Sequence, residues 1–85
     1  MSIRWDPLKS AWLKRVRGMS FEEIVRATLV ATIEHPKRRH QEYLLFEING
    51  YIWAVPYVRD GGGVFLKTAF PSRAYTKKWI RGELE

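Results

Sequence analysis

Arg73 is the residue of this sequence whose type and position best suit the binding of a phosphate group. It follows Pro71-Ser72, a pair that ends a strand and begins a helix. A guanidinium stays charged and binds two phosphate oxygens at once, and the amides of a helix N-terminus can join it. The alternative is an ordinary exposed arginine, although the first turn of a helix is an unfavourable place for a cation. Arg73 is therefore the leading candidate for contact with an anion.

Three further side chains could assist such a site, namely Lys67, Tyr75 and His40. Lys67 lies between apolar residues of a predicted strand, where a charge is costly unless that face is open. It equally suits a lysine that protects an edge strand from aggregation. Tyr75 could orient a base or share a proton, or it could anchor the last helix to the core. His40 titrates near neutral pH, but the arginines beside it disfavour its charged form.

Two clusters of cations are the predicted phosphate contacts. They are Lys37, Arg38 and Arg39 in a loop, and Lys77, Lys78 and Arg81 on the last helix. A solvated helix face explains Lys77 and Lys78 equally well. The chain carries 15 Lys and Arg against 9 Asp and Glu, a formal net charge of +6. Such a charge attracts polyanions, most commonly nucleic acids, although many small proteins are basic only for solubility.

Composition excludes several classes of protein. The 85 residues contain no Cys, so a disulfide framework and thiolate zinc sites are excluded. The two histidines, His35 and His40, lack metal-ligand spacing, and we expect no metal and no other cofactor. No apolar run approaches the roughly 18 residues of a membrane span, and the first residues lack the apolar stretch of a signal peptide. We expect one domain over residues 1–85, located in the cytoplasm.

The elements that must position these residues begin with two helices. Asp6-Pro7 starts a helix over residues 8–17, Gly18 ends it, and the spacing places Leu8, Ala11, Trp12 and Val16 on one stripe. Ser20 and Glu23 form a capping box for a second helix. Apolar residues at helical spacing carry this helix to residue 33, and His35-Pro36 ends it.

Strands follow these helices. Asn49-Gly50 predicts a hairpin between residues 42–48 and 51–58, in which Ile48 faces Tyr51. Pro56 cannot donate to a ladder and predicts a bulge or a sheet edge. Residues 64–70 form a third strand, residues 73–81 a basic helix, and residues 3–5 a possible fourth strand. The predicted fold class is α+β: two N-terminal helices, an antiparallel sheet of three to four strands, and a short C-terminal helix.

In this order the motifs resemble those of BrnT-type toxins of the RelE superfamily. Trp5-Asp-Pro-x-Lys9 followed by Arg17-Gly-x-Ser-Phe-Glu-Glu23 is similar to the family pattern W-D-x-x-K and then G-x-S-F-E-E. Pro71-Ser-Arg73 is similar to the element that leads from the family's last strand into a basic helix. The resemblance covers nearly the whole chain. It departs at Lys67, which is shifted by one position from the usual Arg, and in the loop rich in Arg and His.

The resemblance implies a RelE-like fold, metal-independent cleavage of RNA, and an antitoxin protein as partner. In such a reaction a 2′-hydroxyl attacks the neighbouring phosphate while cations neutralise the growing charge and other groups move protons. We expect Arg73, Lys67, Tyr75 and His40 to do this, with messenger RNA at the ribosome as one candidate substrate. Two other functions fit the same residues: a non-catalytic RNA- or DNA-binding module, and a subunit whose basic face binds an acidic protein.

Overall fold

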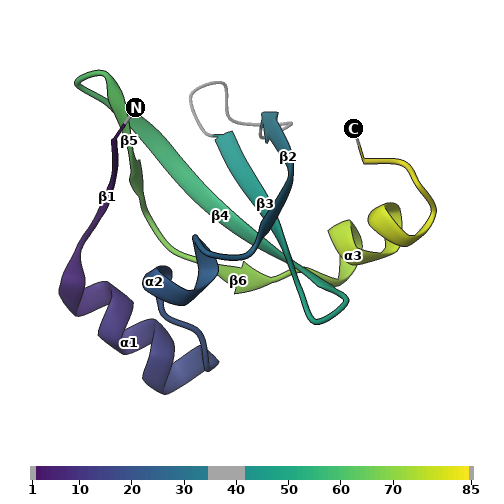
Figure 1. Cartoon of the computed structure of the whole chain (residues 1–85), viewed down its shortest axis with the longest axis horizontal. Helices are drawn as coiled ribbons and strands as arrows, with labels where there is room; N and C mark the ends of the chain where they lie inside the picture. Colours follow the sequence, from purple (N-terminus) through teal and green to yellow (C-terminus); the bar gives the residue numbers. More distant parts are fainter. Residues whose placement is uncertain (1, 35–41, 85) are drawn as a thin grey trace.

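The fold is α+β, as predicted, in a computed structural model that describes residues 2–34 and 42–84 (Figure 1). The elements in chain order are β1 (Ile3–Trp5), α1 (Pro7–Arg17), α2 (Phe21–Ile24), β2 (Thr28–Glu34), β3 (Glu42–Ile48), β4 (Tyr51–Asp60), β5 (Gly63–Leu66), β6 (Phe70–Pro71) and α3 (Arg73–Ile80).

The described strands form one six-stranded mixed sheet, larger than the three- to four-stranded antiparallel sheet that the sequence predicts. Its order is β1-β5-β4-β3-β2, and β6 pairs with β4 beyond the end of β5. β1 runs parallel to β5, whereas the other pairs are antiparallel. β4 is therefore the central strand, and both β5 and β6 pair with it.

The hairpin of β3 and β4 has the predicted register, with Ile48 opposite Tyr51. Asn49 and Gly50 both have positive φ, at 53° and 81°, as a two-residue turn of this kind requires. Pro56 lies neither at an edge nor at a bulge of this pairing, because it stands opposite Tyr43 in the central strand. Instead, the neighbouring strand changes there: Pro56 accepts a hydrogen bond from the Lys67 amide at 2.8 Å, just beyond the end of β5.

The predicted second helix is wrong beyond its first turn. The capping box of Ser20 and Glu23 is present, but α2 ends at Ile24 and residues 28–34 form β2 against β3. This segment is rich in β-branched residues, which suit a strand, and the hairpin edge offers it a partner. Its register shifts between Leu29 and Ala31. This irregularity interrupts the alternation of a regular strand, which is why the apolar spacing imitated a helix.

Helix α1 has the predicted caps, but most of its predicted apolar stripe is exposed, and of these residues Trp12 packs against the core. Asp6 accepts a hydrogen bond from the Leu8 amide at 2.9 Å, and Gly18 has a φ of 88°. However, Leu8 is 80% exposed and Val16 is 55% exposed, while Ser10 and Leu13 are the buried residues of the helix. The Ser10 hydroxyl donates to the Glu22 carboxylate and accepts from the Phe21 amide. Burial of Leu13 and the bonds between Ser10 and α2 therefore determine which side of α1 faces the core.

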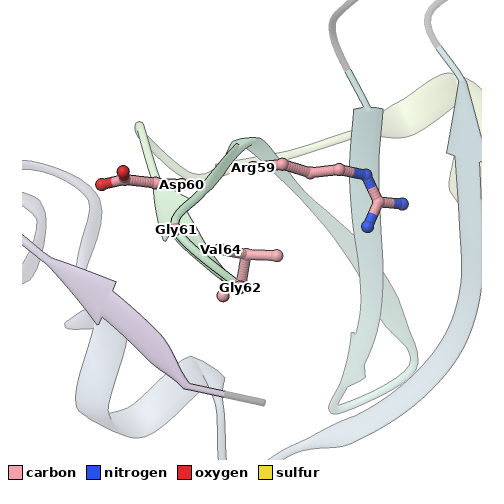
Figure 2. A pocket seen from close by; sticks show the side chains of 6 residues that line it. Arg59, Asp60, Gly61, Gly62 and Val64 are labelled. Carbon is pink, nitrogen blue, oxygen red and sulfur yellow. The ribbon is translucent and has the colours of Figure 1, made fainter.

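Ion pairs hold the turn between β4 and β5 on both sides. The side chains of Arg59 and Asp60 extend away from each other beside the glycines of the turn (Figure 2). Arg59 forms an ion pair with Glu42 of β3 at 3.1 Å, and Asp60 forms one with Arg4 of β1 at 3.1 Å. All four side chains are largely accessible or half-buried, so each pair contributes at most about 1 kcal/mol. The two ion pairs link the end of β4 to β3 on one side and to β1 on the other.

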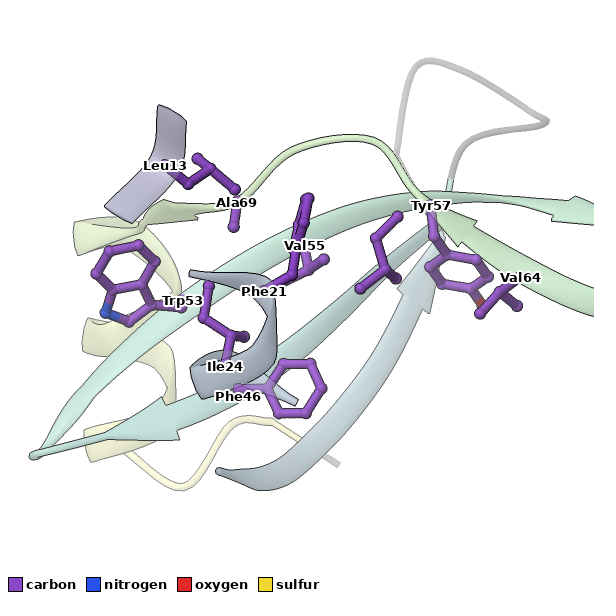
Figure 3. Packing of buried hydrophobic residues seen from close by; sticks show 10 residues of the cluster. Leu13, Phe21, Ile24, Phe46, Trp53, Val55, Tyr57, Val64 and Ala69 are labelled. Atoms are coloured by element: carbon purple, nitrogen blue, oxygen red, sulfur yellow. The ribbon is translucent and has the colours of Figure 1, made fainter. Parts of the chain in front are cut away.

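Apolar residues are buried on both faces of the sheet. On the face that we call the α1 face, the side chains of Phe46, Trp53 and Val55 pack with residues from α1 and α2 (Figure 3). Trp53, 8% exposed, is thus a core residue. On the opposite face, called here the α3 face, Leu45, Ile52 and Ala54 pack with side chains from α3.

Candidate nucleic-acid interface

Arg73 is exposed at the first position of α3, and the start of this helix is bonded firmly to the central strand. The Ser72 amide donates to the Ile52 carbonyl at 2.8 Å, and the Ser72 hydroxyl accepts from the Tyr75 amide at 3.1 Å. The Thr76 hydroxyl accepts from the Ile52 amide at 2.8 Å and donates to the Ser72 carbonyl at 2.6 Å. Ser72 and Thr76 are both buried, so Arg73 stands on a rigid support.

Lys67 is exposed directly after β5 and lies on the α3 face. Its amide is bonded to Pro56, and its Nζ lies 5.8 Å from the ring centre of Phe65. Phe65 and Lys67 are two residues apart, so they share one face of an extended chain. The position suits a cation with an open approach. It lies just beyond the last pair of β1 and β5, Trp5 with Leu66, so protection of a sheet edge stays an alternative role for Lys67.

The register of β4 gives the spacing between Lys67 and Arg73. Lys67 is bonded to Pro56 and Ser72 to Ile52, four residues apart along one strand. At about 3.3 Å per residue this separation is roughly 13 Å between backbones. Long cationic side chains at such a spacing can contact one strand of nucleic acid at two places.

A third arginine, which the sequence pattern does not predict as a site residue, holds the segment between them. Arg17 of α1 donates from one guanidinium nitrogen to the Ala69 carbonyl at 2.6 Å and to the Thr68 hydroxyl at 3.3 Å. It thereby fixes the path of the chain from Lys67 to β6. The partners are about fifty residues apart in sequence, so no local pattern could have revealed the contact.

Tyr75 is half-buried and packs against the apolar cluster of the α3 face, as the anchoring alternative requires. Burial and the neighbouring Tyr43 raise the pKa of Tyr75. Its phenol therefore stays protonated at neutral pH, where it can donate a hydrogen bond but cannot serve as a base. That Tyr75 donates a proton in a reaction stays a prediction.

The cations of the last helix are exposed. Lys77, Lys78 and Arg81 lie toward the C-terminal end of α3, where positive charge also stabilises the helix dipole. Phosphate contact by these three residues stays a prediction. The other predicted contacts, Lys37, Arg38, Arg39 and His40, lie outside the described residues.

Two pockets are described, and both lie away from Lys67 and Arg73. One of about 260 Å³ is formed by the turn after β4, from Arg59 to Val64 (Figure 2). The other, of about 460 Å³, is an apolar hollow of the α1 face lined by Ile3, Leu29, Tyr57 and their neighbours. Neither of these two pockets is lined by Lys67, Arg73 or Tyr75.

Comparison with protein-family models, with curated proteins and with solved structures finds no match for this chain. The resemblance to BrnT-type toxins therefore rests on the motifs alone. In the described part of the chain no helix is long and apolar enough to cross a membrane. Nor do three or more Asp, Glu or His side chains gather there in a way that could hold a metal ion.

Proposed function

We propose that this chain is a metal-independent endoribonuclease of the toxin type, with a RelE-like fold, acting in the cytoplasm and restrained by an antitoxin protein. The observation that supports it most is the set of hydrogen bonds that hold the start of α3, and with it Arg73, to β4. An exposed arginine at a helix start is fixed to the central strand by two buried hydroxyl residues, and exposed Lys67 follows the adjacent strand. Preorganised cations of this kind stabilise the charge that develops on a phosphate.

In the proposed reaction the 2′-oxygen of a ribose attacks the adjacent phosphorus, and the bond from phosphorus to the 5′-oxygen breaks. The products are a 2′,3′-cyclic phosphate and a 5′-hydroxyl. Arg73 and Lys67 neutralise the phosphate oxygens, and the protonated phenol of Tyr75 supplies the proton of the leaving oxygen. The proton of the 2′-hydroxyl must go to a base, for which His40 stays the candidate.

Cleavage of a single-stranded RNA in the presence of EDTA tests the proposal. Wild-type protein should cut RNA, leave the DNA strand of the same sequence intact, and produce cyclic phosphate ends. Arg73→Ala should lower the cleavage rate about 10²- to 10³-fold while most of the binding is retained. Arg15→Ala, which removes an exposed cation of α1, is the matched control and should cut at nearly the wild-type rate. Wild-type protein that leaves RNA intact would refute the nuclease.

Binding without cleavage is the second candidate function, and one observation favours it. Among the described candidate residues, Arg73 is accompanied by Lys67 and by Tyr75, whose pKa is raised. Such groups hold phosphates but do not accept a proton at neutral pH. If Arg73→Ala weakens RNA binding and any cleavage in parallel, the chain is an RNA-binding module.

A further inference from the structure

Four aromatic side chains lie on the α3 face, and three of them are in ring contact. They are Tyr43 of β3, Phe65 of β5, Phe70 of β6 and Tyr75 of α3, and we call them the aromatic patch. Tyr43 and Lys67 flank Pro56 on the two sides of β4, and Phe70 stands opposite Ala54, two residues further along. The patch therefore crosses three neighbouring strands and ends at the helix.

Within the patch, the ring of Tyr43 contacts those of Phe70 and Tyr75 edge to face, and Phe65 lies further along the same face, opposite Val58. The ring centres of Tyr43 and Phe70 are 6.4 Å apart with an interplanar angle of 87°, and those of Tyr43 and Tyr75 are 6.3 Å apart at 84°. All four side chains of the patch are half-buried, so part of each ring remains accessible. Helix α3 packs on the end of the sheet near the β3–β4 turn (Figure 1).

Cations border the patch, and the carboxylates of Glu42 and Glu47 in β3 are engaged in other contacts. The Nζ of Lys67 lies 5.8 Å from the ring centre of Phe65, and that of Lys78 lies 5.9 Å from the ring centre of Tyr75. Glu42 pairs with Arg59, and the Glu47 carboxylate accepts a hydrogen bond from the Gly50 amide at 2.7 Å. A ligand that carries both planar rings and negative charge complements such a surface.

We propose that the aromatic patch binds unpaired nucleobases of single-stranded RNA, which stack on its rings while Lys67 and Lys78 contact the adjoining phosphates. This inference rests on the proposed function only in taking RNA as the ligand. A duplex hides the faces of its bases, whereas a single strand presents them at intervals along a charged backbone. Stacking on an aromatic side chain strengthens binding by about 5- to 150-fold per base.

The experiment compares three strands of about 12 nucleotides by fluorescence anisotropy, all resistant to cleavage because the 2′-oxygen is methylated or absent. One carries uridine bases, the second is abasic with the same charge, and the third is a duplex. Wild-type protein should bind the uridine strand at least tenfold more tightly than either of the others. Phe65→Leu and Phe70→Leu, which retain apolar bulk, should each lose most of this preference without changing the salt dependence of binding.

Trp12→Leu is the matched control, because Trp12 is also a half-buried aromatic bordered by cations, with Lys9 at 4.2 Å, but it belongs to α1. It should keep the wild-type preference for bases. Circular dichroism and thermal melting verify that each variant folds. Since no catalytic step is measured, the result does not depend on whether the protein cleaves RNA.

Other outcomes separate the inference from the proposed function. Equal, strongly salt-dependent affinity for the uridine and abasic strands would overturn the aromatic patch and leave RNA binding by the cations intact. Equal losses in Trp12→Leu and the two Phe variants would overturn it as well. Binding to vesicles of phosphatidylglycerol but to none of the strands would overturn both the patch and the nuclease.

Discussion

Replacement of Thr76 by Val is a sharp test of how the structure supports Arg73. The two side chains have nearly the same shape and similar helix propensity, so the substitution removes little beyond the hydroxyl. That hydroxyl is the acceptor for the Ile52 amide at 2.8 Å, and Thr76 is only 6% exposed. The Ser72 carbonyl keeps its bond from the Thr76 amide, at 3.0 Å, so the orphaned group is the amide of Ile52.

A buried donor without a partner costs about 1–3 kcal/mol, so Thr76→Val should lower the free energy of unfolding by that amount. For a chain of this size, each 1 kcal/mol corresponds to a decrease of about 4–8 °C in Tm. The same change at exposed Thr28 of β2 should stay within about 0.5 kcal/mol of wild type.

Urea denaturation measures both variants, and NMR should show the Ile52 amide proton moving upfield in Thr76→Val alone. If Thr76→Val is as stable as Thr28→Val and the Ile52 resonance does not move, the hydroxyl does not join α3 to β4. The rigid mounting of Arg73 would then lose its support.

Two further predictions concern the N-terminal half of the chain. Leu13→Ala should destabilise the protein by about 2–5 kcal/mol, because the Leu13 side chain is fully buried. Leu8→Ala should cost less than about 0.5 kcal/mol, because Leu8 is exposed. Equal losses of stability in urea denaturation would contradict the exposure of Leu8 in α1. The hydrogen bond from the Ser20 amide, with the contact of Lys14, lowers the pKa of Glu23 to about 2 from 4.5. Since the folded pKa is depressed, this stabilisation is complete above pH 4.5 and is lost as the pH falls toward 2. In Glu23→Gln, the urea midpoint should therefore depend less on pH between about pH 5 and about pH 2 than it does in the wild type. The same pH dependence in both proteins would rule out this role for the carboxylate.

Local signals in the sequence were sufficient for the ends of helices and for the central hairpin. Asp6, Gly18 and Ser72 cap helices where their types predict it, and Asn49-Gly50 sets the register of β3 and β4. These features depend on neighbours a few residues away, so the pattern contains the whole cause.

Features that depend on distant partners could not be predicted in this way. Residues 28–34 form a strand because the edge of β3 is available to them, and the register shift hides their alternation. The side of α1 that faces the core follows from the burial of Leu13 and from the bonds between Ser10 and α2. The third predicted strand is divided between β5 and β6, and Thr68 and Ala69, which lie between these strands, are bonded to Arg17.

In the candidate site, too, the local features could be predicted from the sequence and those that depend on distant partners could not. The residue types Arg73 and Lys67 follow from the sequence, and so does the helix start that carries Arg73. The aromatic patch does not, because its rings come from four separate elements and share a face only through the register of β4. The catalytic assignments of Arg73, Lys67, Tyr75 and His40 remain predictions for the cleavage assay.

The parallel pairing of β1 with β5 sets the order in which the molecule can be completed. Residues 3–5 find their sheet partners only at residues 64–66, and an added Cβ at Gly63 would collide with Ser2. While the ribosome is still synthesising the middle of the chain, the first strand therefore has nothing to pair with. The pairing of β1 with β5 is therefore a late step in the folding of the nascent chain, and a side chain at residue 63 would obstruct it.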